Sequence, residues 1–276
     1  MYAARTVMSP TKIRVPEAPA DLEEKRSQWQ RAAEAGDSEA MNSLGILYSQ
    51  WAEQPDLEAA RRWFERAASA GNSHAISNLG ALCAGSHPPD VDGARRWYEL
   101  GADAGNSDAM FNLGLLYLEQ MKPPDLDAAR HWYERAADAG NTDALYNLGV
   151  LHAQYMKPPD LDTARHWYER AAAAGNPDAM YTLGYLHENW LQPPDLDTAR
   201  RWYEQAAETG NTNAMVALMA LYAYKLKDKK AAKQWLERAY DAGHDMSTVV
   251  GDSSVKRAGL RLFRLTKVFD RKLDQW

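Results

Sequence analysis

Apolar positions along most of the chain recur with the period of a helix. Between Pro158 and Gly175 the chain reads PPDLDTARHWYERAAAAG, and apolar residues stand at i, i+3, i+4, i+7 and i+8 counted from Ala164. This spacing forms one face of an amphipathic helix. The proline pair disfavours helix before this stretch, Asp160 is suited to cap its first turn, and a glycine commonly ends a helix. The pattern therefore predicts a helix between Asp160 and Gly175.

A second helix is predicted directly after the first. It begins near Asn176, stops before the next proline pair, and places Ala179, Leu183 and Leu186 on one face. Gly184 has no side chain on the other side of the helix, so a neighbouring helix can approach closely there. We call this second helix, with its Leu-Gly pair, the A helix, and the preceding helix, with its tryptophan, the B helix.

These two helices recur along the chain at steps of 33 to 35 residues, the period of a helical repeat protein. A Leu-Gly pair marks the A helix in five copies, and the sixth copy has Leu218-Met219 at that place. The tryptophan of the B helix recurs as Trp29, Trp63, Trp97, Trp132, Trp167, Trp202 and Trp235. The glycine after the B helix recurs as Gly36, Gly71, Gly105, Gly140, Gly175, Gly210 and Gly243.

Neither helix is expected to be stable alone. Helices shorter than about 12 to 15 residues are marginal in water, and an isolated Trp-Tyr-Ala stripe would leave apolar surface in water. Stacked copies cover these stripes, and a stack grows without enlarging a central core. The 276 residues are therefore predicted to form one elongated repeat domain, with the Trp-Tyr pairs in the core between copies.

The repeated pattern resembles a known family. It reads AxxLGxLY in the A helix, then a Pro-Asp turn, then AxxWYxxAAxxG in the B helix, and extends from about Asp21 to Gly243. This pattern is similar to that of the Sel1-like repeats, which are related to the tetratricopeptide repeats. The resemblance implies an all-α, right-handed superhelical solenoid of antiparallel helix pairs that serves as a protein interaction scaffold or adaptor. Four turns depart locally from the family, because they have a proline pair where the family often has glycines.

The chain is expected to have three parts. Residues 1–20 are predicted to be a disordered leader, and residues 21–243 to form the solenoid, with six full helix pairs after an N-terminal half repeat. Residues 244–276 are predicted to cap the last repeat through a basic amphipathic helix, because solenoids cover their terminal apolar face. Docking of this basic helix on an anionic membrane or on an acidic partner is the alternative.

Composition argues against several classes of protein. The hydrophobic fraction is 45%, and no apolar run approaches the roughly 20 residues that span a bilayer. The N-terminal segment lacks the apolar stretch of a secretory signal, and Cys83 is the single cysteine, so a cytoplasmic location is expected. The net charge of -6 disfavours nucleic acid as the main partner. RNA binding is the alternative function, because another helical repeat of similar period reads bases.

The sequence predicts no catalytic centre, no metal site and no cofactor. Catalysis needs unlike groups that converge, and the two Ser-x-x-Lys stretches at 9–12 and 253–256 lack companion motifs. His152 and His187 stand where other copies have tyrosine or cysteine, so they are expected to be repeat-core residues rather than metal ligands. Arginines four residues before glutamates on the B helices predict exposed ion pairs. We therefore expect a protein that is not an enzyme.

A partner protein or peptide is expected on the A-helix face opposite the core stripe, which lines the concave groove in stacked helix pairs. In copies three to five this face has aromatic residues one turn from an acid, which suits a peptide with apolar anchors and basic residues. The asparagine before the Leu-Gly pair resembles one that holds the ligand backbone in tetratricopeptide domains. Packing against the adjacent repeat is the alternative for the rings. The expected partner-binding residues are Asn78, Asp108, Phe111, Asn112, Leu115, Asp143, Tyr146, Asn147, Val150, Asp178, Tyr181, Tyr185 and Glu188.

Overall fold

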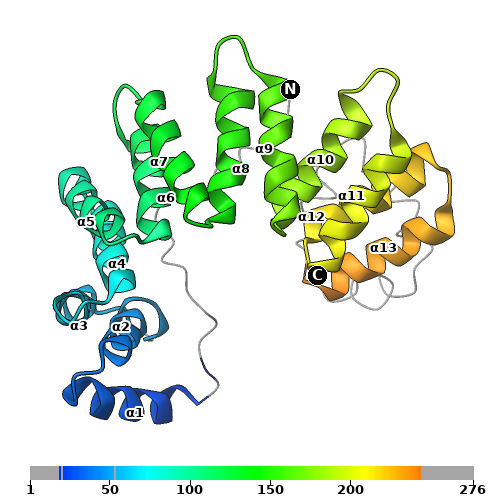
Figure 1. The fold of residues 1–276 in the computed structure, drawn as a ribbon. Helices are drawn as coiled ribbons and strands as arrows, with labels where there is room; N and C mark the ends of the chain where they lie inside the picture. The colour runs from blue at the N-terminus through cyan, green and yellow to red at the C-terminus, as the bar shows by residue number, and fades with distance from the viewer. Residues whose placement is uncertain (1–18, 20, 53, 244–276) are drawn as a thin grey trace. The chain divides into compact units, whose positions relative to one another are not determined.

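The computed structural model describes residues 19, 21–52 and 54–243. The regular structure of these residues is helical, with thirteen α-helices and no strand (Figure 1). The all-α class and the alternation of A and B helices are thus confirmed. The predicted leader, Pro19 apart, and the predicted capping helix lie outside the described residues.

The chain divides into two compact units after Ala164. The first unit holds the half repeat, three full repeats and the A helix of the fourth. Three of its four A helices continue into a π-helical turn. The helices are α1 (Leu22–Glu34), α2 (Ser38–Ile46), α3 (Leu57–Ser69), α4 (Ser73–Ala84), α5 (Val91–Asp103), α6 (Ser107–Leu115), α7 (Leu126–Asp138) and α8 (Thr142–Val150), with the π-helical turns η1 (Leu47–Trp51), η2 (Leu116–Gln120) and η3 (Leu151–Tyr155).

The second unit begins at Arg165, within the B helix of the fourth repeat, and continues through the fifth and sixth repeats. Of its two A helices, the first stays α-helical to its end and the second continues into a π-helical turn. The helices are α9 (Leu161–Ala173), α10 (Pro177–Asn189), α11 (Leu196–Glu208), α12 (Thr212–Ala220), η4 (Leu221–Lys225) and α13 (Lys229–Asp241).

The B helices of the full repeats begin and end as predicted. An aspartate before each helix accepts hydrogen bonds from backbone N–H groups of the first turn at 2.8–3.1 Å, as Asp160 does from Thr163. The glycine after each B helix has φ between 78° and 96°, a left-handed conformation that costs other residues strain. These two signals set the length of the helices and therefore the register of the repeats.

The glycine of the Leu-Gly pair makes room for an aromatic ring of the following B helix. A Cβ atom at Gly45, Gly80, Gly114 or Gly184 would lie only 2.3–2.6 Å from that ring. The rings are at most 1% exposed, so they fill the space between the two helices. The prediction that a glycine permits close helix approach is confirmed at these four positions. The four rings are those of Phe64, Tyr98, Tyr133 and Tyr203.

Tryptophans of the B helices are less buried than the sequence predicts. Trp63, Trp132, Trp167 and Trp235 are partly exposed, and an arginine three residues later lies over each indole ring at 4.3–4.6 Å. Such cation–π contacts contribute about 0.5–1 kcal/mol at exposed sites. The second residue of the Trp-Tyr pair is therefore a core residue, whereas the tryptophan covers the edge of the core.

Candidate interaction surface

Three residues of the expected partner-binding set lie in the core instead. Phe111, Leu115 and Val150 are 9%, 1% and 4% exposed. The ring centroid of Phe111 lies 5.8 Å from that of Tyr133 in the B helix of the same repeat. The expectation that these side chains face a groove was wrong, because the buried arc of an A helix is wider than the stripe read from the sequence. Phe111 thus packs on a ring of its own repeat, whereas the alternative expectation named the adjacent repeat.

The A helix of the fifth repeat, α10, has the best developed surface of the expected kind. Asp178, Tyr181, Tyr185 and Glu188 are spaced at i, i+3, i+7 and i+10, and all four are partly exposed. This spacing places them along one side of a helix. We call these four residues the α10 face. In the first unit, Asp143 and Tyr146 of α8 are likewise partly exposed.

The α10 face rests on the buried ring of Tyr203. The centroids of Tyr181 and Tyr203 are 5.8 Å apart, and the Tyr203 hydroxyl donates a hydrogen bond to Oε2 of Glu188 at 3.0 Å. Burial raises the pKa of Tyr181 above its ordinary value, and the nearby Tyr185 and Glu188 act in the same direction. Tyr181 therefore combines packing with partial exposure, and Glu188 is held in a fixed position.

Asparagines at the starts of the A helices join consecutive repeats. In Asn72, Asn106, Asn141 and Asn211, Oδ1 accepts a hydrogen bond from a backbone N–H of the first turn at 2.9–3.0 Å. Their Nδ2 atoms donate to a side chain of the preceding A helix at 2.9–3.3 Å. The acceptors are Glu39, Ser73, Asp108 and Asp178, respectively. Two carboxylates expected to bind a partner, Asp108 and Asp178, thus also hold the stack together.

Replacing Asn141 should separate the two roles of these asparagines. Asn141→Ala removes both the cap and the bond to Asp108, and should lower the free energy of unfolding by about 2–3 kcal/mol. Asn141→Ser keeps a capping oxygen and loses the inter-repeat bond, so about half of that loss is expected. Urea denaturation followed by circular dichroism measures both variants. A serine variant as stable as the wild type would show that the bond to Asp108 contributes nothing.

The asparagines that precede the Leu-Gly pairs also contact the neighbouring repeat. Nδ2 of Asn78 donates to Oδ1 of Asn42 at 2.9 Å, and Nδ2 of Asn112 donates to Oγ of Ser77 at 3.4 Å. Asn147 is 5% exposed. A role in holding the backbone of a ligand stays a prediction for Asn78 and Asn112, whereas Asn147 is a buried residue.

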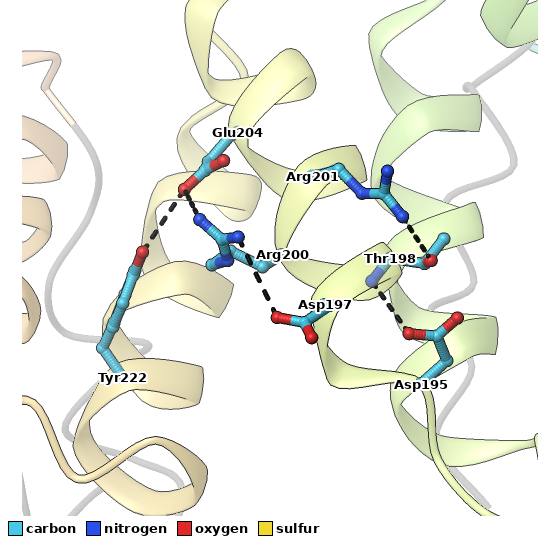
Figure 2. Close-up of polar contacts among 7 residues, drawn as sticks. All are labelled: Asp195, Asp197, Thr198, Arg200, Arg201, Glu204 and Tyr222. Atoms are coloured by element: carbon cyan, nitrogen blue, oxygen red, sulfur yellow. Dashed lines mark hydrogen bonds and ion pairs between the residues drawn. The ribbon is translucent and has the colours of Figure 1, made fainter.

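A polar network on α11 links the fifth and sixth repeats (Figure 2). Glu204 accepts hydrogen bonds from Arg200 at 3.4 Å and from the Tyr222 hydroxyl of η4 at 3.3 Å. Arg200 also lies 3.9 Å from Asp197.

Among the arginine–glutamate pairs predicted on the B helices, Arg95–Glu99, Arg165–Glu169 and Arg200–Glu204 form at 3.4–3.8 Å. Arg130 instead pairs with Asp127 at 2.9 Å.

Two histidines, His152 and His187, lie toward the ends of A helices, near the aspartate that caps the next B helix. Nδ1 of His152 is 3.9 Å from Oδ2 of Asp160, and both His152 and His187 are partly buried. The pKa of Asp160 is lowered, chiefly by its hydrogen bonds from Thr163 and to a smaller extent by His152. Within residues 21–52 and 54–243, no group of three His, Cys, Asp or Glu side chains could hold a metal ion.

Helix pairs of this kind define an α-solenoid. The chain belongs to the Sel1 repeat family, since the model of the Sel1 repeat matches residues 38–72, 73–106, 107–141, 142–176, 177–211 and 215–244. The resemblance found in the sequence is thereby confirmed. Sel1 repeat proteins are generally protein–protein interaction scaffolds, and their solenoid fold is generally non-catalytic. In the part of the chain that the structure describes, no helix is both long and apolar enough to cross a membrane.

Several solved structures are similar to this chain. A Sel1 repeat protein from Oxalobacter formigenes is 26% identical with a TM-score of 0.64, and the match covers 80% of this chain and 99% of that one. The protective antigen c5321 of uropathogenic Escherichia coli is 25% identical with a TM-score of 0.58, covering 81% of this chain and 50% of that one. The immunity protein PA5088 of Pseudomonas aeruginosa shares the fold, at 21% identity and a TM-score of 0.53, covering 71% and 76%. No curated protein matches the chain.

Proposed function

We propose that this protein is a non-catalytic scaffold that binds a partner protein or peptide on its A helices. The observation that carries the proposal is the α10 face, where two partly exposed tyrosines lie between two carboxylates along one side of a helix. Tyrosine is enriched among the residues that dominate the free energy of protein–protein binding. The general role of Sel1 repeat proteins as interaction scaffolds supports the same function.

The chemistry of the α10 face favours a partner with apolar anchors and basic side chains. Asp178 accepts one hydrogen bond from Asn211, and Glu188 accepts one from Tyr203. A carboxylate has about four lone-pair sites, so the Glu188 carboxylate can accept from a lysine or arginine in addition to Tyr203. Because both carboxylates are already held in place, less side-chain entropy is lost when a partner binds.

A selection from a random peptide library tests this preference. Peptides selected on the full chain are expected to combine an aromatic or aliphatic residue with lysine or arginine. Truncating a partly exposed ring of the α10 face, in the variant Tyr185→Ala, should weaken their binding at least tenfold, since an interface hot spot contributes about 2 kcal/mol or more. Calorimetry or fluorescence anisotropy measures the dissociation constant.

The matched control is Leu100→Ala, which removes a side chain that is 50% exposed on a B helix. This variant should bind the selected peptides like the wild type. Melting curves establish that all variants are folded to the same extent. Equal affinity of the tyrosine variant and the wild type would refute binding on the A helices.

A further inference from the structure

Large apolar side chains gather at two turns of the second unit. Trp190 and Leu191 follow α10 and are 45% and 36% exposed, and Tyr224 and Leu226 lie before α13 and are 39% and 37% exposed. The two turns occupy the same place in consecutive repeats, between the A and B helices, so the shared register places them along one edge of the stack. We call these four residues the apolar turn residues.

The corresponding turns of the first unit lack such exposure. Met121 and Tyr155, at equivalent places in the third and fourth repeats, are only partly exposed. The other large apolar side chains that are as exposed among the described residues lie singly on B helices, as Leu57 and Leu100 do. Because scattered exposed leucines are normal and clusters are not, the apolar turn residues point to a contact surface.

A dense group of lysines surrounds one of these turns. The segment from Tyr224 to Lys233 reads YKLKDKKAAK, with five of the twelve lysines in the chain and a single acid. Lys225, Lys227 and Lys230 are exposed, and the acid, Asp228, is occupied in capping α13. The chain as a whole has a net charge of -6, so this basic segment differs in charge from the rest of the chain. A ligand that binds at this basic segment is therefore expected to be anionic.

The arrangement favours a lipid surface over a protein. At the turn before α13, exposed apolar residues alternate in sequence with lysines, as Tyr224, Lys225, Leu226 and Lys227, and Trp190 and Leu191 stand at the end of α10, the A helix of the preceding repeat. Tryptophan and tyrosine prefer the interface between headgroups and acyl chains, and lysine reaches the phosphates with its ammonium group. Protein hot spots instead favour well-packed pockets that exclude water. From these observations we infer that this edge of the fifth and sixth repeats docks on a membrane that contains anionic phospholipid.

Sedimentation of the full chain with lipid vesicles tests the inference. The protein should bind vesicles of phosphatidylcholine with 30% phosphatidylserine and should not bind pure phosphatidylcholine. Lys225→Gln/Lys227→Gln should lower the partition coefficient about thirtyfold, given the contribution of one lysine near an anionic surface. Trp190→Ser/Leu226→Ser should lower it about tenfold through lost apolar burial.

The matched control is Leu57→Ser/Leu100→Ser, which removes two leucines of equal or greater exposure away from the turns. This control should bind phosphatidylserine vesicles like the wild type. Absence of binding by the wild type, or unchanged binding by both turn variants, would overturn the inference, the latter because another segment would then account for binding. Retention on poly-glutamate with no vesicle binding would also overturn it, in favour of an acidic protein partner.

Discussion

Replacing Gly114 with a larger residue is expected to destabilise the protein strongly. A Cβ atom at Gly114 would lie 2.5 Å from the buried ring of Tyr133, which leaves no space for it. Overpacking of this kind lowers the free energy of unfolding by about 3 kcal/mol, whereas the better helix propensity of alanine offsets only about 1 kcal/mol of this loss. Gly114→Ala should therefore lose about 2 kcal/mol, and Gly114→Met about 4 kcal/mol. Denaturation in urea measures both.

The sixth repeat supplies the control for this prediction. It has methionine in place of the glycine, Met219, and leucine in place of the ring, Leu236, and both are buried. A larger residue on the A helix is thus matched by a smaller one on the B helix. Gly114→Met/Tyr133→Leu should accordingly be more stable than Gly114→Met alone. If the second substitution adds further destabilisation, the ring is not what excludes a side chain at Gly114.

Alkaline solution is expected to unfold the protein through its buried tyrosines. Burial raises the pKa of Tyr98, Tyr133 and Tyr203 above the ordinary value near 10. Above that value the unfolded chain loses the three protons while the native state keeps them, so stability is complete below about pH 10 and falls as the pH rises. Well above pH 10 each tyrosine contributes about 1.4 kcal/mol per pH unit. Between pH 10 and pH 11 the unfolded tyrosines are still partly protonated, so each contributes about 1 kcal/mol and the three together about 3 kcal/mol.

Denaturation curves at pH 8, 10 and 11 measure this fall, and Tyr133→Phe provides the control. The Tyr133 hydroxyl is buried and makes no hydrogen bond of ordinary geometry among the described residues, although the Asn147 side chain is near enough to lower its pKa slightly. The first full repeat has Phe64 at the same place. The variant should therefore be at least as stable as the wild type at pH 8, and its loss between pH 10 and pH 11 should be smaller by about a third. If both proteins lose the same stability between pH 10 and pH 11, Tyr133 does not contribute to the alkaline unfolding.

The sequence was sufficient for the fold because its signals are local and recur in every copy. The capping aspartates, the glycines after the B helices and the stripe through Ala164 and Tyr168 each act within a few residues, and all appear in the structure. The π-helical turns could not be predicted, because α4 and α10 end without them on similar sequence. They depend on packing that a single helix does not reveal.

The candidate site was predicted less completely, for a geometric reason. A helical wheel divides a helix into two sides, whereas an A helix packs against its own B helix and against its neighbours. Phe111, Leu115 and Val150 fall in this wider buried arc. The exposed rings of Trp190 and Tyr224 were missed, because in the sequence they read only as the ends of predicted helices. An unusual density of lysine after Tyr224 was the available signal.

The asparagines at the starts of the A helices donate hydrogen bonds to the preceding A helix, and we call each such bond an asparagine joint. These joints indicate how the length of this chain can change. Each joint needs only an asparagine at the start of one A helix and an acceptor in the first turn of the A helix before it. Glutamate, serine and aspartate all serve as that acceptor. A whole unit of about 35 residues, inserted or deleted at the Gly-Asn boundary, therefore restores an equivalent joint at once. Repeat number can thus vary without new interfaces, and surfaces carried by single repeats can be gained or lost one unit at a time.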